Sequence, residues 1–461
     1  MMNLFQQLEK EGTSRDLDQD STSGKKSPIE LRIWEALYPD KPFNDMQFRR
    51  LCEQLVKWLE EYLAIQAFRK DQDTKDLFLL KKMSTGPLQP FFLTTLHKIK
   101  NRLDRQPTRD RHYFRKQFQL EGEHQQYLRW YTHDLPENPY QHLQYSLDQW
   151  WILEKLRMGI MNLTLPARQK PEEFPLAPII ESLEETKMAE ANPLIKMYLA
   201  IHYLYAGKPI DVEEIISLIK YNSQLLSKDN LMTAYQVVLN HLAVRANQTR
   251  ERFYYQKLHE MYSWAIDREL VFMGEYLPAA YYKNIITLSL LLANTEVPEE
   301  RTHYLQVGYN YLHHLRHFLP PQDQEDEFYF NLAYYYFAAG DFAKVESSLG
   351  GRPFKNLQYA IQGRILGMRA RYEMRDFYHL ASSIRSLMVY IRKHLPEGNL
   401  YRAPFLNMLR FFRRLVESQT ADELSKLERA IISSQKVVEK AWLLQKVKER
   451  RENNNYSTQM V

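Results

Sequence analysis

Two nine-residue stretches, residues 332–340 (LAYYYFAAG) and 199–207 (LAIHYLYAG), decide the fold that this sequence predicts. Each begins with a Leu-Ala pair, carries a tyrosine three residues after that alanine and ends in Ala-Gly. The alanine of the Leu-Ala pair is small and lets a second helix approach closely, and the aromatic side chains around it fill the space between neighbouring helix pairs. The final glycine is typical of a helix that closes in the left-handed conformation. Each stretch therefore predicts the first helix of a packed pair.

The two stretches lie 133 residues apart, about four periods of a ~34-residue helical repeat. Glycine supplies only 14 of the 461 residues, fewer than a fold rich in β-turns needs. Apolar residues recur at helical spacing along the C-terminal two-thirds of the chain. We therefore predict an all-α fold that ends in an array of paired helices. The predicted pairs are 194–206 with 211–226, 229–246 with 250–269, 279–293 with 299–318, 326–339 with 341–349, 356–373 with 376–395, and 400–417 with 421–450.

One of these pairs resembles a tetratricopeptide repeat (TPR). The residues that carry the resemblance are Tyr329 at the usual tryptophan position, Leu332 and Ala333 as the Leu-small pair, Tyr336, the turn Gly340-Asp341-Phe342, Val345 and Leu349. The second helix then meets Gly-Gly-Arg-Pro at 350–353, short of a full repeat, and a later turn at 375–377 (RDF) lacks the glycine. The resemblance implies a TPR-like α-solenoid with a concave wall that binds a partner.

The first third of the chain has helical patterns but no visible repeat. We predict a disordered lead-in over 1–27, a helical domain over 28–168, and a proline-rich linker with a first helix over 169–193. The repeat array then covers 194–451, and a disordered tail covers 452–461.

Two helix starts are visible in the sequence. Asn44 is placed to cap a helix that runs to about Phe68, with Phe43 packing against Phe48. The capping-box segment 420–423 (TADE) begins a last helix that extends to about Arg451 and caps the array.

The composition excludes several classes of protein. The 62 basic and 57 acidic residues leave a net charge of only +5, so the chain as a whole is not a basic nucleic-acid coat. The single cysteine, Cys52, excludes an intrachain disulfide and leaves a Cys-based zinc site without partners. The most apolar segment, 285–293, is far shorter than the ~20 residues of a membrane span, and the N-terminus has no signal-peptide pattern. We therefore predict a cytoplasmic protein without a membrane partner.

No motif for catalysis, a metal or a cofactor stands out. His313 and His317 lie one helical turn apart, but a zinc site needs further ligands, and a helix C-terminus favours histidine in any case. Carboxylate pairs such as Glu172-Glu173 and Glu184-Glu185 fall near helix starts or on polar faces, where negative charge is favourable or solvated. We therefore predict a protein without a cofactor that is not an enzyme.

Charge is the strongest regional signal. Residues 352–414 contain thirteen basic side chains, eleven of them arginine, and three acidic ones. Arginine binds carboxylates and phosphates through a planar fork, which lysine lacks. Arg364, Arg371 and Arg375 lie at helical offsets of seven and eleven, so they are predicted to line one stripe. The predicted partner-binding residues are Arg364, Arg371, Arg375, Arg410, Arg413, Arg414 and Tyr335.

This basic region has three interpretations. Charged helix faces are usually a solvated surface. The arginines can also bind an acidic protein segment through bidentate contacts, or nucleic acid through phosphate contacts and stacking on aromatic rings. The leading prediction is a non-enzymatic scaffold that binds an anionic protein segment, and the alternative is a nucleic-acid-binding helical-repeat protein. A less favoured alternative is an enzyme with its site at the junction near residues 150–210.

Overall fold

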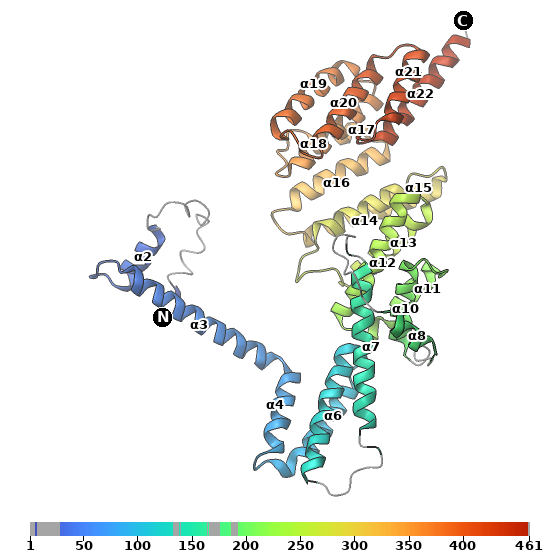
Figure 1. Ribbon diagram of the computed structural model, residues 1–461. Coiled ribbons are helices and arrows are strands. Elements are labelled where there is room, and N and C mark those ends of the chain that lie inside the picture. Colours follow the sequence, from blue (N-terminus) through green and yellow to red (C-terminus); the bar gives the residue numbers. More distant parts are fainter. Residues whose placement is uncertain are drawn as a thin grey trace. The chain divides into compact units, whose positions relative to one another are not determined.

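The computed structural model describes residues 5–6, 28–131, 138, 140–163, 165, 176–185 and 192–459 (Figure 1). Within these ranges the chain is all-α, and the one β-type pairing is an isolated bridge between Met273 and Tyr276. Most of the predicted lead-in, and residues 169–175 and 186–191 of the predicted linker and first helix, lie outside the described residues.

The chain forms two compact units. The first unit comprises residues 1–156, 176–195 and 224–227, and the second comprises 157–175, 196–223 and 228–461. The elements of the first unit are α2 (Pro28–Leu37), α3 (Asp45–Lys70), α4 (Gln72–Ser84), η1 (Gln89–Phe91), α5 (Phe92–Asp104), α6 (Arg111–Tyr131), α8 (Ala177–Glu185) and most of α7 (Gln141–Leu163).

The start of α3 confirms the cap predicted from the sequence. The side chain of Asn44 accepts a hydrogen bond from the Gln47 N–H at 3.0 Å, and the Phe43 and Phe48 rings lie 5.8 Å apart. These contacts fix the entry of the chain into the helix, because the cap satisfies a free N–H and the two rings pack across the turn. Trp34 of α2 is buried against Phe48.

In the second unit, each helix from α11 (Val212–Asn222) to α22 (Lys440–Gln459) packs against the next along the chain, as in a helical repeat (Figure 1). Helices α14, α16 and α18 also contact one another in order. The elements are α10 (Pro193–Tyr205), α11 (Val212–Asn222), η3 (Ser223–Leu225), α12 (Lys228–Thr249), α13 (Arg252–Asp267), α14 (Ala279–Leu292), α15 (Pro298–His314), η4 (Arg316–Phe318), α16 (Gln324–Ala339), α17 (Phe342–Leu349), α18 (Leu357–Glu373), α19 (Phe377–His394), α20 (Arg402–Glu417), α21 (Ala421–Ser433) and α22 (Lys440–Gln459), with α10 and η3 partly in the first unit.

The two stretches that opened the sequence analysis close their helices as predicted. Gly207 and Gly340 have φ values of 71° and 86°, in the left-handed region. The next residue in each case donates its N–H to the carbonyl five residues back, at 3.1 Å for Lys208 and 2.9 Å for Asp341. Ala333 is completely buried, so the small side chain does bring neighbouring helices together.

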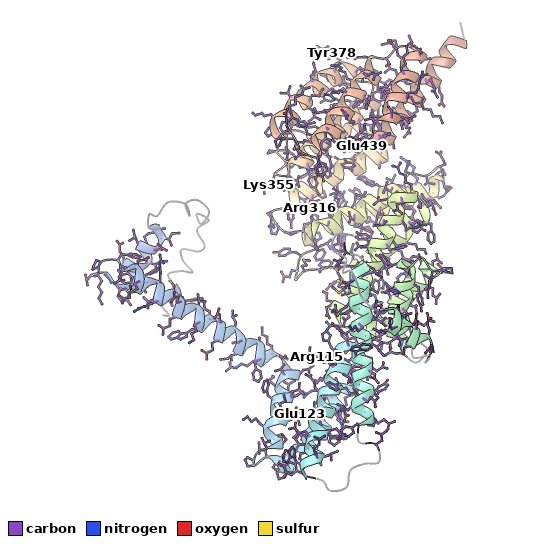
Figure 2. All side chains as sticks on the ribbon, in the orientation of Figure 1. Arg115, Glu123, Arg316, Lys355, Tyr378 and Glu439 are labelled. Atoms are coloured by element: carbon purple, nitrogen blue, oxygen red, sulfur yellow. The ribbon has the colours of Figure 1, made fainter. Side chains whose placement is uncertain are left out.

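The prediction of a single last helix over 421–450 is wrong. Helix α21 ends at Ser433, Glu439 takes a left-handed φ of 54°, and α22 folds back from there (Figure 2). The Lys440 ammonium donates to the carbonyls of Ile432 and Ser434 at 2.7 and 2.9 Å, which satisfies groups left free at the end of α21. Helix α22 then continues to Gln459, past the predicted tail boundary at residue 452, because neither glycine nor proline interrupts it.

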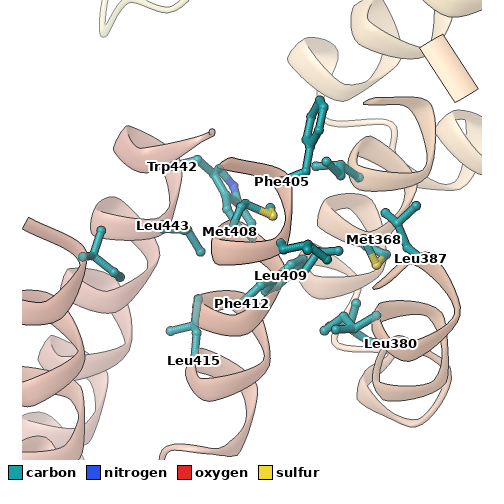
Figure 3. Close-up of a cluster of buried hydrophobic side chains, with 14 of the residues drawn as sticks. Met368, Leu380, Leu387, Phe405, Met408, Leu409, Phe412, Leu415, Trp442 and Leu443 are labelled. Atoms are coloured by element: carbon teal, nitrogen blue, oxygen red, sulfur yellow. The ribbon is translucent and has the colours of Figure 1, made fainter. Parts of the chain in front are cut away.

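The fold-back builds the hydrophobic core of the last repeats. Trp442 and Leu443 of α22 are buried beside Met408, Phe412 and Leu415 of α20 (Figure 3). The Trp442 and Phe412 rings meet edge to face with centroids 5.0 Å apart. The array is therefore closed by a helical hairpin in place of the single predicted helix.

Candidate anion-binding groove

A groove of about 960 Å³ opens between α17, α18 and α19, and we call it the α18 groove. Two of the seven predicted binding residues, Arg364 and Arg371, line it. Its other lining residues are Glu346, Leu349, Gly350, Gly351, Arg352, Pro353, Phe354, Ala360, Gly363, Gly367, Met368, Ser382, Ser383, Ser386, Leu387 and Tyr390.

Glycines make room for this groove. A Cβ atom on Gly363 would lie 3.2 Å from a methyl carbon of Leu349, and one on Gly367 would lie 3.8 Å from the other methyl carbon. The end of α17 therefore lies directly on the glycine face of α18. Gly351 has a φ of 69°, a conformation that suits glycine and turns the chain from α17 toward α18.

Arg364 is the groove cation that remains open to a ligand. Its guanidinium lies over the ring of Tyr390, 4.0 Å from the centroid, and the residue is exposed. Among the described residues it has no ion-pair partner. The aromatic ring holds the guanidinium in place by a cation–π contact, while its edge N–H groups stay free to donate.

Arg371 is already engaged inside the groove. Its Nε pairs with the carboxylate of Glu346 on α17, and its Nη1 donates to the Ser383 hydroxyl at 2.6 Å. That hydroxyl in turn donates to the His379 carbonyl at 2.9 Å. The three contacts orient the Arg371 guanidinium between α17 and α19.

Arg352 is a groove residue that the sequence analysis did not single out. It stacks on Tyr329 at 3.3 Å from the ring centroid and lies 3.4 Å from a Glu325 carboxylate oxygen. In the sequence, Arg352 belongs to the basic region but follows two glycines at the end of a short repeat, so helical spacing does not align it with Arg364 and Arg371. With Arg364, Arg371 and Glu346, it gives the groove lining a net charge of +2.

Arg375 does not belong to the predicted stripe. Helix α18 ends at Glu373, and Arg375 has a left-handed φ of 61° in the turn that follows. Its N–H donates to the Tyr372 carbonyl, and the N–H of Asp376 donates to the Arg371 carbonyl, as in the Gly340 turn. Arg375 occupies the turn position that Gly340 has in the earlier repeat. It lies beyond the end of α18, so helical spacing does not place it on one face with Arg364 and Arg371.

The three predicted arginines of α20 lie outside the groove lining. Arg410, Arg413 and Arg414 are exposed on one side of that helix. Arg410 donates to the Asn407 side chain at 3.0 Å, and Arg413 pairs with Glu417 at 3.5 Å. These side chains present positive charge to solvent without converging on a concave site.

Tyr335, the remaining predicted residue, also lies outside the groove lining. It packs beside Tyr309 of α15 with ring centroids 5.3 Å apart. Burial raises the pKa of its hydroxyl above the ordinary value of tyrosine.

The basic region as a whole holds more positive charge than its own carboxylates can pair. Helix α19 has no acidic residue, and its exposed Arg385, Arg392 and Lys393 have no ion-pair partner among the described residues. Tyr378 is exposed at the first turn of the same helix (Figure 2). These three cations do not line the α18 groove, so they add positive charge to the array outside it.

A second cavity, of about 910 Å³, lies in the first unit, and Lys100, Asp104 and Glu121 are among its lining residues. Lys100 pairs with Glu121 at 2.7 Å, and His124 lies 3.6 Å from the same carboxylate. Burial raises the pKa of Glu121, but the hydrogen bonds from His124 and Lys100 outweigh it and bring the pKa to about 2. Asp104, the other carboxylate of the lining, accepts a hydrogen bond from the Tyr113 hydroxyl at 3.0 Å, so this cavity has an acidic lining where the α18 groove has a basic one.

The described residues contain no group of three or more His, Cys, Asp and Glu side chains that is placed to hold a metal ion. His313 packs on the rings of Tyr309 and Phe328, and burial lowers its pKa. The junction at 150–210, the less favoured place for an enzyme site, falls partly outside the described residues.

In the part of the chain that the structure describes, every helix is too short or too polar to cross a membrane. Comparison with protein-family models, with curated proteins and with solved structures gives no match to this chain.

Proposed function

We propose that this protein is a non-enzymatic scaffold that binds an acidic segment of a partner protein in the α18 groove. The TPR-like array supplies the rigid frame, and Arg364 supplies the open charge. The observation that carries the proposal is the exposed Arg364 guanidinium, held on Tyr390 inside a concave groove and free of any ion pair among the described residues. A guanidinium in this state can form bidentate hydrogen bonds with a carboxylate.

The lining of the groove favours a protein segment over nucleic acid. The ring of Tyr390 is covered by Arg364, so that face is not available to stack on a base. Three serines, 382, 383 and 386, line the α19 side, where hydroxyl groups can bond to a peptide backbone.

The test is the affinity of a fluorescent Asp/Glu-rich peptide for the full chain, measured by anisotropy at fixed salt. Arg364→Glu removes a charge-assisted contact and is expected to weaken binding by about tenfold or more. Arg410→Glu, an equal charge reversal outside the groove lining, is the matched control and is expected to change affinity less than about twofold.

Equal losses in the two variants would mean that general surface charge attracts the peptide, and would contradict the groove as the site. A single-stranded oligonucleotide is titrated in parallel. If it binds in an Arg364-dependent manner while the peptide does not, the ligand class is wrong.

A further inference from the structure

The α18 groove contains two arginines on one helix that differ in their state. Arg364 and Arg371 are seven residues apart, which places them about 10.5 Å apart along the helix axis. Arg364 has no ion pair among the described residues, whereas Arg371 is held by the carboxylate of Glu346. The groove thus has one open cationic position and one that the protein fills with its own side chain.

We propose that Glu346 is an internal competitor that occupies the second carboxylate position of the groove, and that a partner with two correctly spaced acidic side chains displaces it. This inference rests on the proposed function and specifies the partner further. A segment with one acidic side chain binds at Arg364 alone. A segment with two also takes the Arg371 position from Glu346.

The contacts of Glu346 support exchange. The carboxylate approaches Arg371 on its Nε edge, while Ser383 holds the Nη1 side, so the guanidinium stays oriented when the carboxylate leaves. The side chains of Arg371 and Glu346 are 31% and 37% exposed, so solvent and ligand reach both. A partly exposed ion pair contributes little net stability, and its replacement by another carboxylate therefore costs little.

The spacing of the arginines sets the register of the ligand. A peptide in the polyproline II conformation advances about 3.1 Å per residue with three residues per turn, so side chains at positions 1 and 4 lie on the same face about 9 Å apart. A peptide with aspartate at its first and fourth positions matches Arg364 and Arg371.

The experiment compares two labelled peptides in a Gly/Ser background, one with aspartate at positions 1 and 4 and one with aspartate at position 1 only. Glu346→Gln is expected to bind the two-acid peptide about tenfold more tightly than the unmodified chain does, because it frees charge-assisted contacts of Arg371. The one-acid peptide is expected to change less than about threefold. Glu397→Gln, which removes a 93% exposed carboxylate outside the groove lining, is the matched control and is expected to leave both affinities unchanged.

An unchanged or weaker affinity of Glu346→Gln for the two-acid peptide overturns the inference. So does an equal gain for both peptides or an equal gain in Glu397→Gln, because either result shows a general charge effect. These results leave the proposed function standing when Arg364→Glu still weakens peptide binding by about tenfold or more. Loss of the proposed function is distinct, since neither peptide then binds in an Arg364-dependent manner. Circular dichroism of each variant verifies that it is folded.

Discussion

Replacing Leu443 by alanine tests the fold-back that distinguishes this C-terminus from a single helix. Leu443 is 0% exposed in the cluster that joins α22 to α20 (Figure 3). If residues 421–450 formed one uninterrupted helix, Leu443 would continue away from the end of α21 and would not fold back against α20. The stability of the last repeats should therefore depend on this side chain.

The expected loss follows from the burial of Leu443. Alanine removes three carbon atoms, worth about 0.8 kcal/mol each in transfer free energy. A residual cavity adds to this, because Trp442 and Phe412 are held by their edge-to-face contact and cannot fill the space freely. We expect the variant to lose about 3 kcal/mol of unfolding free energy in the terminal repeats.

The assay is urea unfolding combined with hydrogen exchange measured on peptides from α20, α21 and α22. Because repeat arrays are stabilised mainly by contacts between neighbours, faster exchange should be concentrated in these three helices. Leu400→Ala is the control, since Leu400 is 86% exposed and should change stability by less than about 0.5 kcal/mol. Indistinguishable exchange in the two variants would refute the packing of α22 against α20.

Two further predictions concern the turns and the buried polar groups of the array. Gly340→Ala should destabilise the chain by about 1–2 kcal/mol in urea unfolding, because alanine is strained at a φ of 86°. Gly122 lies inside α6, where an added Cβ has nothing within 4 Å, so Gly122→Ala should instead raise the free energy of unfolding by about 0.5–1 kcal/mol. A loss of stability in both variants would contradict this explanation. Burial and the charge of His303 lower the pKa of His259 from 6.5 to about 4, so folding favours its neutral form. Stability is therefore full above pH 6.5 and decreases as the pH falls toward 4, by about 2 kcal/mol between pH 7 and 5. Unfolding at both pH values should show a smaller decrease in His259→Gln, and an unchanged decrease would exclude His259 as the cause.

Local signals in the sequence were sufficient for much of the fold. The caps at Asn44 and Thr420 are both present, and the latter forms the complete capping box with Glu423. These features depend on residues within one turn of each other, so the sequence shows them directly. The same holds for Gly340, where one residue type suits the left-handed turn.

Longer-range features were not visible in the sequence. Nothing adjacent to Glu439 reveals that its carboxylate pairs with Arg369 at 2.7 Å, or that α22 turns back to place Trp442 in the core. The candidate site was predictable only in part. Arg364 and Arg371 were found by helical spacing, but Glu346 lies on another helix, and its pairing with Arg371 depends on how α17 packs on α18.

The most direct test of the account is a double-mutant cycle between Arg364 and an acidic residue of the peptide ligand. The four affinities to compare are those of the unmodified chain and Arg364→Ala, each with the aspartate peptide and with its asparagine counterpart. The account predicts a coupling free energy of about 1 kcal/mol or more, because the guanidinium and the carboxylate contact each other directly in the groove. A coupling free energy of zero, with both single changes simply additive, would contradict the claim that the α18 groove binds the acidic segment through Arg364.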